Sequence, residues 1–171
     1  MITLRSQNRI VTVGLFGAVS VVLGVLENFI PLPIPGVRLG LANLGVMMML
    51  YIAGIAPAAG VMLLKICLVS LLSGNLFFRL SLSAPAGLMA LLGMCLLFKY
   101  LSRYVSAIGL GIAGAALHML SQLYVINIFY IKGIFYSGIV GWFLLAATAT
   151  GVLTGIVTAV TVTRLKSLQV S

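Results

Sequence analysis

The chain contains one acidic residue, Glu27, and no aspartate, against ten lysines and arginines. Glu27 lies near the end of a long apolar stretch, where an unpaired carboxylate is costly, so we interpret it as functional. A chain with only one carboxylate side chain cannot carry out several kinds of chemistry. It cannot form an acid/base pair with a second carboxylate, and it cannot supply the set of oxygen ligands that Mg²⁺ requires. We therefore expect a binding protein rather than an enzyme, with no cofactor.

A basic residue, Lys65, lies in the middle of another apolar stretch. A lysine at the centre of a membrane helix costs about 2.5–3.5 kcal/mol on insertion scales, so it needs a partner or an aqueous cavity. Two arrangements are open: Lys65 pairs with Glu27 and joins two helices, or Lys65 binds an anionic group and leaves Glu27 to Arg38. Lys65, Arg38 and Arg79 outnumber Glu27, and this surplus of positive charge favours a carboxylate- or phosphate-bearing ligand.

Between Glu27 and Arg38 the chain carries prolines at alternate positions, Pro31, Pro33 and Pro35. Such a segment is stiff and extended, and ordering it costs little entropy. Either the two terminal charges pair and fix how the loop folds back over a helix bundle, or the loop is a lid that presents Arg38 to a ligand. The two interpretations are compatible.

Four further polar residues belong to the candidate ligand site: Asn75, Arg79, His118 and Gln122. His118 and Gln122 are four residues apart and share one helix face. A lone histidine in an apolar helix is more often an interhelical hydrogen-bonding residue than a metal ligand, so we expect no metal site. We expect these four residues to line a cavity with Lys65. Its lid and mouth would be formed by Glu27, Asn28, Arg38 and Asn43.

The elements that must position these residues are apolar helices. The chain is 63% hydrophobic and 6% charged, whereas about a quarter of the residues of a soluble domain are charged. Recurring apolar stretches of about 17 residues or more predict an all-α integral membrane protein with a single domain. The net charge of +9 comes from scattered basic residues, which fits membrane topology better than nucleic-acid binding. Six transmembrane helices are expected, at about residues 10–30, 39–56, 57–73, 82–98, 106–130 and 135–163.

The distribution of basic residues predicts the orientation of these helices. With both termini cytoplasmic, the inner face carries six basic residues: Arg5, Arg9, Lys99, Arg103, Arg164 and Lys166. The outer face then carries three: Arg38, Arg79 and Lys132. The positive-inside rule favours this arrangement. The polar residues around Glu27 then face outward, in a multi-pass protein of the cell membrane.

Small residues recur at four-residue spacing on the first and last predicted helices. They are Gly14 and Ala18 on the first, and Ala147, Gly151 and Gly155 on the last. Such surfaces allow helix backbones to approach closely. For the last helix we favour packing within the bundle. For the first, docking of a separate membrane subunit competes with that interpretation.

The segment 27–43 reads Glu-Asn-Phe-Ile-Pro-x-Pro-x-Pro-Gly-x-Arg-Leu-Gly-Leu-Ala-Asn. It resembles the signature of the Gx transporter family, whose members are also labelled heptaprenyl diphosphate synthase component I. The resemblance covers most of the chain and continues through Lys65, where the family commonly has arginine, and through segments 71–74 and 81–83. Segment 83–86 departs from the glycine-containing pattern expected there. By length, helix number and the small-residue motif of the first helix, the family is similar to substrate-binding S components of energy-coupling-factor transporters.

This resemblance implies uptake of a vitamin-, isoprenoid- or quinone-precursor-like molecule. It also implies partners, namely a transmembrane coupling subunit and cytoplasmic ATPases, since the chain has no phosphate-binding loop of its own. The synthase label implies an alternative, a non-catalytic membrane accessory subunit of heptaprenyl diphosphate synthase or of isoprenoid-quinone biosynthesis. A third possibility is a self-sufficient channel or facilitator, against which the lack of an internal repeat argues.

Overall fold

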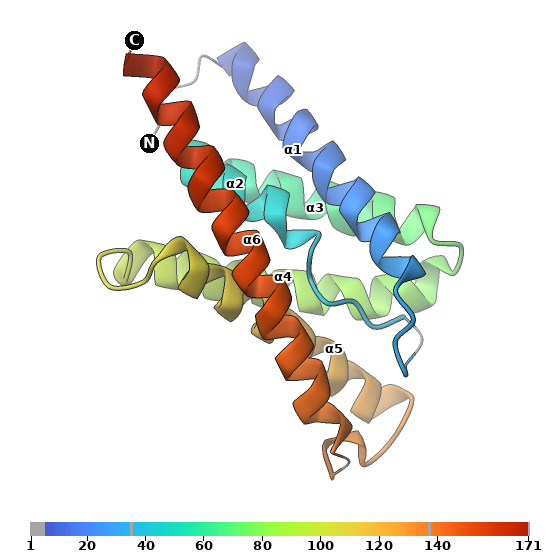
Figure 1. Ribbon diagram of the computed structural model, residues 1–171. Coiled ribbons are helices and arrows are strands. Elements are labelled where there is room, and N and C mark those ends of the chain that lie inside the picture. Colours follow the sequence, from blue (N-terminus) through green and yellow to red (C-terminus); the bar gives the residue numbers. More distant parts are fainter. Residues whose placement is uncertain (1–5, 35, 137, 171) are drawn as a thin grey trace.

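The computed structural model of the protein describes residues 6–34, 36–136 and 138–170 (Figure 1). These residues form helices and loops without any strand, which confirms the predicted all-α class for this part of the chain. The α-helices are α1 (Ser6–Leu26), α2 (Asn43–Ala53), α3 (Ile55–Leu72), α4 (Leu76–Tyr100), α5 (Ala107–Phe129) and α6 (Ile139–Val170). Two short 3₁₀-helices accompany them, η1 (Glu27–Phe29) and η2 (Ile134–Tyr136).

Five of the helices, α1, α3, α4, α5 and α6, are long and apolar enough to cross a membrane. Their outward surfaces carry large apolar side chains, and Ile10 of α1, Phe77 of α4 and Trp142 of α6 are each at least 75% exposed. Large apolar side chains are also exposed on α3 and α5, and exposed apolar surfaces on all of the long helices are typical of a protein that faces lipid. The protein therefore has the architecture of a multi-pass membrane protein.

The second helix is shorter than the predicted span of 39–56. The chain stays in a loop up to Ala42, and α2 ends at Gly54, whose φ of 92° L side chains rarely adopt. Its 11 residues extend about 16 Å, roughly half the thickness of the hydrocarbon core. Whether the chain crosses the membrane six times, as the sequence predicts, therefore stays a prediction.

The fourth helix begins earlier than the predicted residue 82. The segment 76–81 is polar and aromatic, yet it is helical, because α4 begins directly after the Gly74 turn with a hydrogen bond from the Arg79 N–H to the Asn75 carbonyl (2.9 Å). Pro85 lies inside this helix. The extra turns matter for the site, because they place Arg79 on the first part of α4.

The loop between η1 and α2 is part of the core rather than a surface connection. Ile34, Val37 and Leu39 are buried in the same apolar cluster as Leu82 of α4 and Leu123 of α5. The Thr150 hydroxyl of α6 also donates a hydrogen bond to the Leu39 carbonyl (3.0 Å). The loop is therefore held inside the end of the bundle toward which α1 runs.

The predicted close packing of the last helix is confirmed, and its partner is α5. A Cβ atom added at Gly151 would lie 2.6 Å from the Cα of Ile112, and one added at Gly155 would lie 2.4 Å from the Cα of Ile108. These atoms belong to the backbone of α5, so they cannot move aside as the end of a side chain can. The two helices can approach this closely only because glycine stands at these positions.

We expect Gly151→Ala to destabilise the protein by about 1–3 kcal/mol, because the added methyl group overpacks the α5–α6 contact. Gly141, on the same helix, is the matched control, since a Cβ there meets no atom within 4 Å. Thermal unfolding of the purified protein in detergent measures both variants. Equal melting temperatures for Gly151→Ala and Gly141→Ala would contradict the packing described.

Candidate functional site

Six of the residues that the sequence singles out lie buried together at the end of the bundle that holds the loop. None of them is more than 4% exposed. They come from η1, the following loop, α2, α3 and α5, and they are Glu27, Arg38, Asn43, Lys65, His118 and Gln122. We call this set the buried polar cluster. Buried charges are rare in proteins unless they are paired or bind a ligand, so this cluster is the natural candidate for a functional site.

Glu27 holds the backbone of the loop. Its Oε1 accepts a hydrogen bond from the Leu41 N–H (2.5 Å), while its Oε2 is buried without a hydrogen-bond partner among the described residues. The positive charges of Lys65 and Arg38 both act on the carboxyl group. Glu27 therefore anchors the loop directly and interacts with the two cations through its charge.

Lys65 is bonded to a neutral side chain. Its Nζ donates a hydrogen bond to Asn43 Oδ1 (2.6 Å), which joins α3 to the first residue of α2. Asn43 Nδ2 and His118 Nδ1 are buried without a partner among the described residues. Both side chains lie beside Gly40, where an added Cβ would come within 3.2 Å of Asn43 Nδ2 and 3.7 Å of His118 Cδ2. The cluster thus retains unused hydrogen-bonding capacity around Lys65.

The Gln122 side chain binds the backbone of the loop at Arg38. Its Oε1 accepts from the Arg38 N–H (2.9 Å), and its Nε2 donates to the Arg38 carbonyl (2.9 Å). The amide of Gln122 therefore pairs with both backbone groups of one loop residue. This contact fixes the position from which the Arg38 side chain extends.

The Arg38 guanidinium reaches two serines that are not among the predicted site residues. It donates to the Ser83 hydroxyl of α4 (3.1 Å) and to the Ser73 hydroxyl at the end of α3 (3.3 Å), while its Nε is buried without a partner among the described residues. Burial lowers the pKa of Arg38 to about 10, the charge of Arg79 adds to this effect, and Glu27 opposes it. Arg38 therefore still carries its charge at neutral pH. Ser73 and Ser83 lie in the segments that carry the family resemblance, which is the signal that could have identified them.

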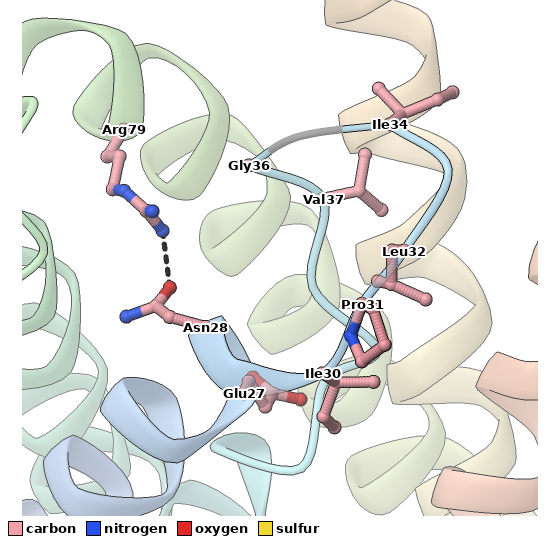
Figure 2. A pocket seen from close by; sticks show the side chains of 9 residues that line it. All are labelled: Glu27, Asn28, Ile30, Pro31, Leu32, Ile34, Gly36, Val37 and Arg79. Carbon is pink, nitrogen blue, oxygen red and sulfur yellow. Dashed lines mark hydrogen bonds between the residues drawn. The ribbon is translucent and has the colours of Figure 1, made fainter.

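A second chain of contacts connects Arg38 to Arg79. Asn28 Nδ2 donates to the same Ser73 hydroxyl (2.8 Å), and Arg79 donates to Asn28 Oδ1 (Figure 2). Ser73 and Asn28 thus lie between two guanidinium groups. Each of these contacts joins residues at least 35 positions apart, so no local sequence pattern announces them.

A pocket of about 250 Å³ opens beside this chain of contacts. Glu27, Asn28 and Arg79 form its polar wall, and loop residues form its apolar wall (Figure 2). The apolar residues are Ile30, Pro31, Leu32, Ile34 and Val37. The pocket thus presents a polar side and an apolar side to a single small molecule.

The remaining predicted residues occupy different positions. Five of them are buried with the loop and do not line this pocket, namely Arg38, Asn43, Lys65, His118 and Gln122. Their contact with a ligand stays a prediction. Asn75 is exposed at the start of α4. Gly14 and Ala18 are exposed on α1, where a shallow groove also lined by Pro57 and Leu64 adjoins Gly14.

Comparison with known proteins gives one match. A family model described as heptaprenyl diphosphate synthase component I matches residues 16–161, a range that includes the whole buried polar cluster and the pocket. Searches of curated proteins and of solved structures gave no match.

Proposed function

This chain belongs to the heptaprenyl diphosphate synthase component I family, and from its site we propose that it is a substrate-binding membrane subunit of an ATP-driven uptake transporter. In this role it resembles the S components of energy-coupling-factor transporters. It binds a small anionic molecule from the outer side of the cell membrane. It delivers that molecule inward with the help of partner proteins.

The observation that carries this proposal is the buried surplus of positive charge. Arg38 and Lys65 are almost fully buried, and their hydrogen-bond acceptors are neutral: two serines and Asn43. Removing charges from water is expensive unless an opposite charge compensates them, and Glu27 is the only acidic side chain in the chain. An anionic ligand would supply the missing charge. The pocket beside Arg79 provides a place for it to enter.

The proposed topology has six crossings with both termini in the cytoplasm. Five long helices make five of them, and α2 with the preceding loop makes the sixth inside the bundle. The start of α1 and the end of α6 lie at the same end of the molecule (Figure 1). Glu27 follows the opposite end of α1, so the pocket faces outward in this orientation. The positive-inside count of six basic residues against three supports the same choice.

The proposed partners are a transmembrane coupling subunit and cytoplasmic ATPases. The exposed small residues Gly14 and Ala18 offer the coupling subunit a close approach to α1. A Cβ added at Gly14 would meet no atom of this chain within 4 Å. ATP hydrolysis falls to the partners because this chain contains no phosphate-binding loop.

A second candidate function follows from the family's description. The chain would then be a membrane accessory subunit of heptaprenyl diphosphate synthase, without catalytic residues of its own. A prenyl diphosphate synthase ionises an Mg²⁺-bound diphosphate, and Mg²⁺ needs several oxygen ligands that one glutamate cannot provide. The partner in this case would be a soluble synthase rich in aspartate.

Affinity purification of the tagged protein from its native membranes, after mild detergent extraction, separates the two functions. We expect mass spectrometry to identify a coupling subunit and ATPases among the co-purified proteins, together with a small anionic ligand. Recovery of a soluble prenyl diphosphate synthase without ATPases would refute the transport function and support the accessory role. A parallel purification of an unrelated multi-pass protein controls for abundant membrane ATPases.

A further inference from the structure

We infer that the ligand of this pocket is a compact monoanion that also carries an uncharged N–H or O–H donor. Arg79 binds its anionic group, Glu27 Oε2 accepts a hydrogen bond from its donor, and its apolar body lies along the loop. This inference rests on the proposed function, because it takes the pocket to be the ligand site. It goes further by naming the two polar groups that the ligand presents and the residue that binds each of them.

Glu27 has a hydrogen-bond acceptor that the protein leaves unused. Its Oε1 accepts from the Leu41 N–H (2.5 Å), whereas its Oε2 is buried without a hydrogen-bond partner among the described residues. A carboxylate oxygen that is removed from water without a donor is costly. Glu27 lines the pocket although it is only 2% exposed. A ligand donor that enters this part of the pocket would supply the missing hydrogen bond.

The charges around Glu27 favour an uncharged donor over an ammonium group. Lys65 and Arg38 are buried and do not line the pocket, and both act on the Glu27 carboxyl through their positive charge. These two cations already outnumber the single carboxylate. An ammonium group beside Glu27 would add a third positive charge to this region, whereas a ring N–H or a hydroxyl donates without adding charge.

Arg79 is the basic residue that lines the pocket, and it can hold an anion. Among the described residues it donates to Asn28 Oδ1, and a guanidinium has several further N–H donors. Guanidinium groups bind carboxylates through paired, charge-assisted hydrogen bonds. Arg79 is half-buried, so a ligand in the pocket can reach it without rearrangement of the core. One guanidinium in the lining matches one negative charge on the ligand.

The positions of these two residues set the shape of the ligand. Figure 2 shows Arg79 and Glu27 apart on the pocket wall, with Asn28 between them. The anionic group and the donor therefore belong at separate places on the ligand. The pocket volume of about 250 Å³ lies just below the ~300–1,000 Å³ typical of pockets for drug-sized molecules. Because the loop wall is apolar, with residues such as Ile30 and Leu32, a small ring system suits the space between the two polar groups.

Isothermal titration of the full chain in lipid nanodiscs at pH 7 tests the inference with bicyclic probes that differ in one group each. Indole-5-carboxylate and indole-6-carboxylate carry the anion and an uncharged N–H donor at two separations. The matching benzothiophene carboxylates lack the donor, and indole lacks the anion. Isoindoline-5-carboxylate carries a cationic donor instead. Empty nanodiscs are the blank for partition into lipid.

We expect the better of the two indole acids to bind about ten-fold or more tightly than each of the other probes. Each of these probes lacks one charge-assisted hydrogen bond or adds a positive charge beside Glu27. Equally tight binding of the benzothiophene acid would show that Glu27 Oε2 takes no donor from the ligand, and it would overturn the inference. Equally tight binding of indole or of the isoindoline acid would overturn it too, as would no binding of either indole acid.

The variant Arg79→Gln tests the contact with the anion. It is expected to weaken binding of the better indole acid about ten-fold or more, because it removes the charge-assisted contact. The preference over the benzothiophene acid should remain, since Glu27 is unchanged. Lys132→Gln, which removes an exposed positive charge outside the pocket, is the matched control and should bind as the unaltered chain does. Unchanged affinity in Arg79→Gln would contradict the assignment.

The double variant Glu27→Gln/Lys65→Met tests the contact with the donor. The Leu41 N–H occupies the glutamine oxygen, so the amide N–H₂ group takes the position of Oε2 and offers no acceptor. We expect the preference for the indole acid to be lost in the double variant and kept in Lys65→Met alone. A preference kept in both would contradict the assignment to Glu27. Should the double variant fail to fold, the probe series on the unaltered chain decides.

These titrations need no partner protein, so their outcome is separate from that of the proposed function. A preference for the indole acid in a chain that co-purifies with a synthase, without ATPases, would refute transport alone. ATPase partners combined with equal binding of the indole and benzothiophene acids would refute this inference alone.

Discussion

Glu27→Gln is expected to destabilise the folded protein by about 3–5 kcal/mol, the typical effect of removing one partner from a group of buried charges. Glutamine keeps an oxygen that can accept the Leu41 N–H, so the hydrogen bond that anchors the loop can survive. The negative charge is lost. Lys65 and Arg38 would then remain buried beside each other without an acidic side chain to compensate them.

The double variant Glu27→Gln/Lys65→Met isolates this charge effect. Because methionine removes the uncompensated cation, the double variant should lose less stability than the sum of the two single variants. Unfolding by SDS titration of the purified protein measures all three, with Lys99→Met as the control at an exposed basic position on α4. Strictly additive losses would show that Glu27 and Lys65 do not interact, and the charge network described here would then be wrong.

The buried polar cluster could be predicted in outline because ionisable residues are so costly in apolar surroundings. Glu27, Lys65 and Arg38 stand out in a sequence that is only 6% charged, and the structure brings all three together. Their partners could not be predicted in the same way. Lys65 bonds to Asn43 and Glu27 bonds to the backbone of Leu41, which depends on how the loop folds into the core.

The helix boundaries could also be predicted only in part from the sequence. Hydropathy identifies the long helices, but it cannot distinguish a spanning helix from a loop that the bundle buries. The apolar residues Val37 and Leu39 resemble the beginning of a membrane helix, yet they fill the core from within a loop. Gln122 makes this possible, since it satisfies both backbone groups of Arg38 where no helix does so.

Serine side chains were the main omission from the predicted site. Ser73 and Ser83 are small polar residues on apolar helices, where a serine often bonds only to its own helix backbone. Ser73 does donate to the Val69 carbonyl (2.6 Å), but its oxygen also accepts from Asn28 and Arg38. Only the three-dimensional arrangement of η1 and the loop around the end of α3 reveals this second use.

The double variant Gly14→Leu/Ala18→Leu is expected to reduce ATP-driven uptake to the level of cells that lack the chain. In the proposed transporter, these two positions on α1 contact the coupling subunit, and two leucines would hold the helices apart. Both positions are exposed in the isolated chain, and a Cβ at Gly14 meets no atom within 4 Å, so folding should not suffer. Leucine also has a higher helix propensity than glycine.

The same variant should bind ligand as the unaltered chain does, because the pocket begins at Glu27, beyond the opposite end of α1. Uptake by cells that express the coupling subunit and ATPases, together with titration of the purified chain, measures the two properties separately. Ala149→Leu, at an exposed small residue of α6, is the matched control and should leave uptake intact. Full uptake by the double variant would exclude α1 as the docking surface. A loss of both binding and uptake would instead mean that the substitutions disturb the fold, since a docking face contributes to transport without contributing to affinity.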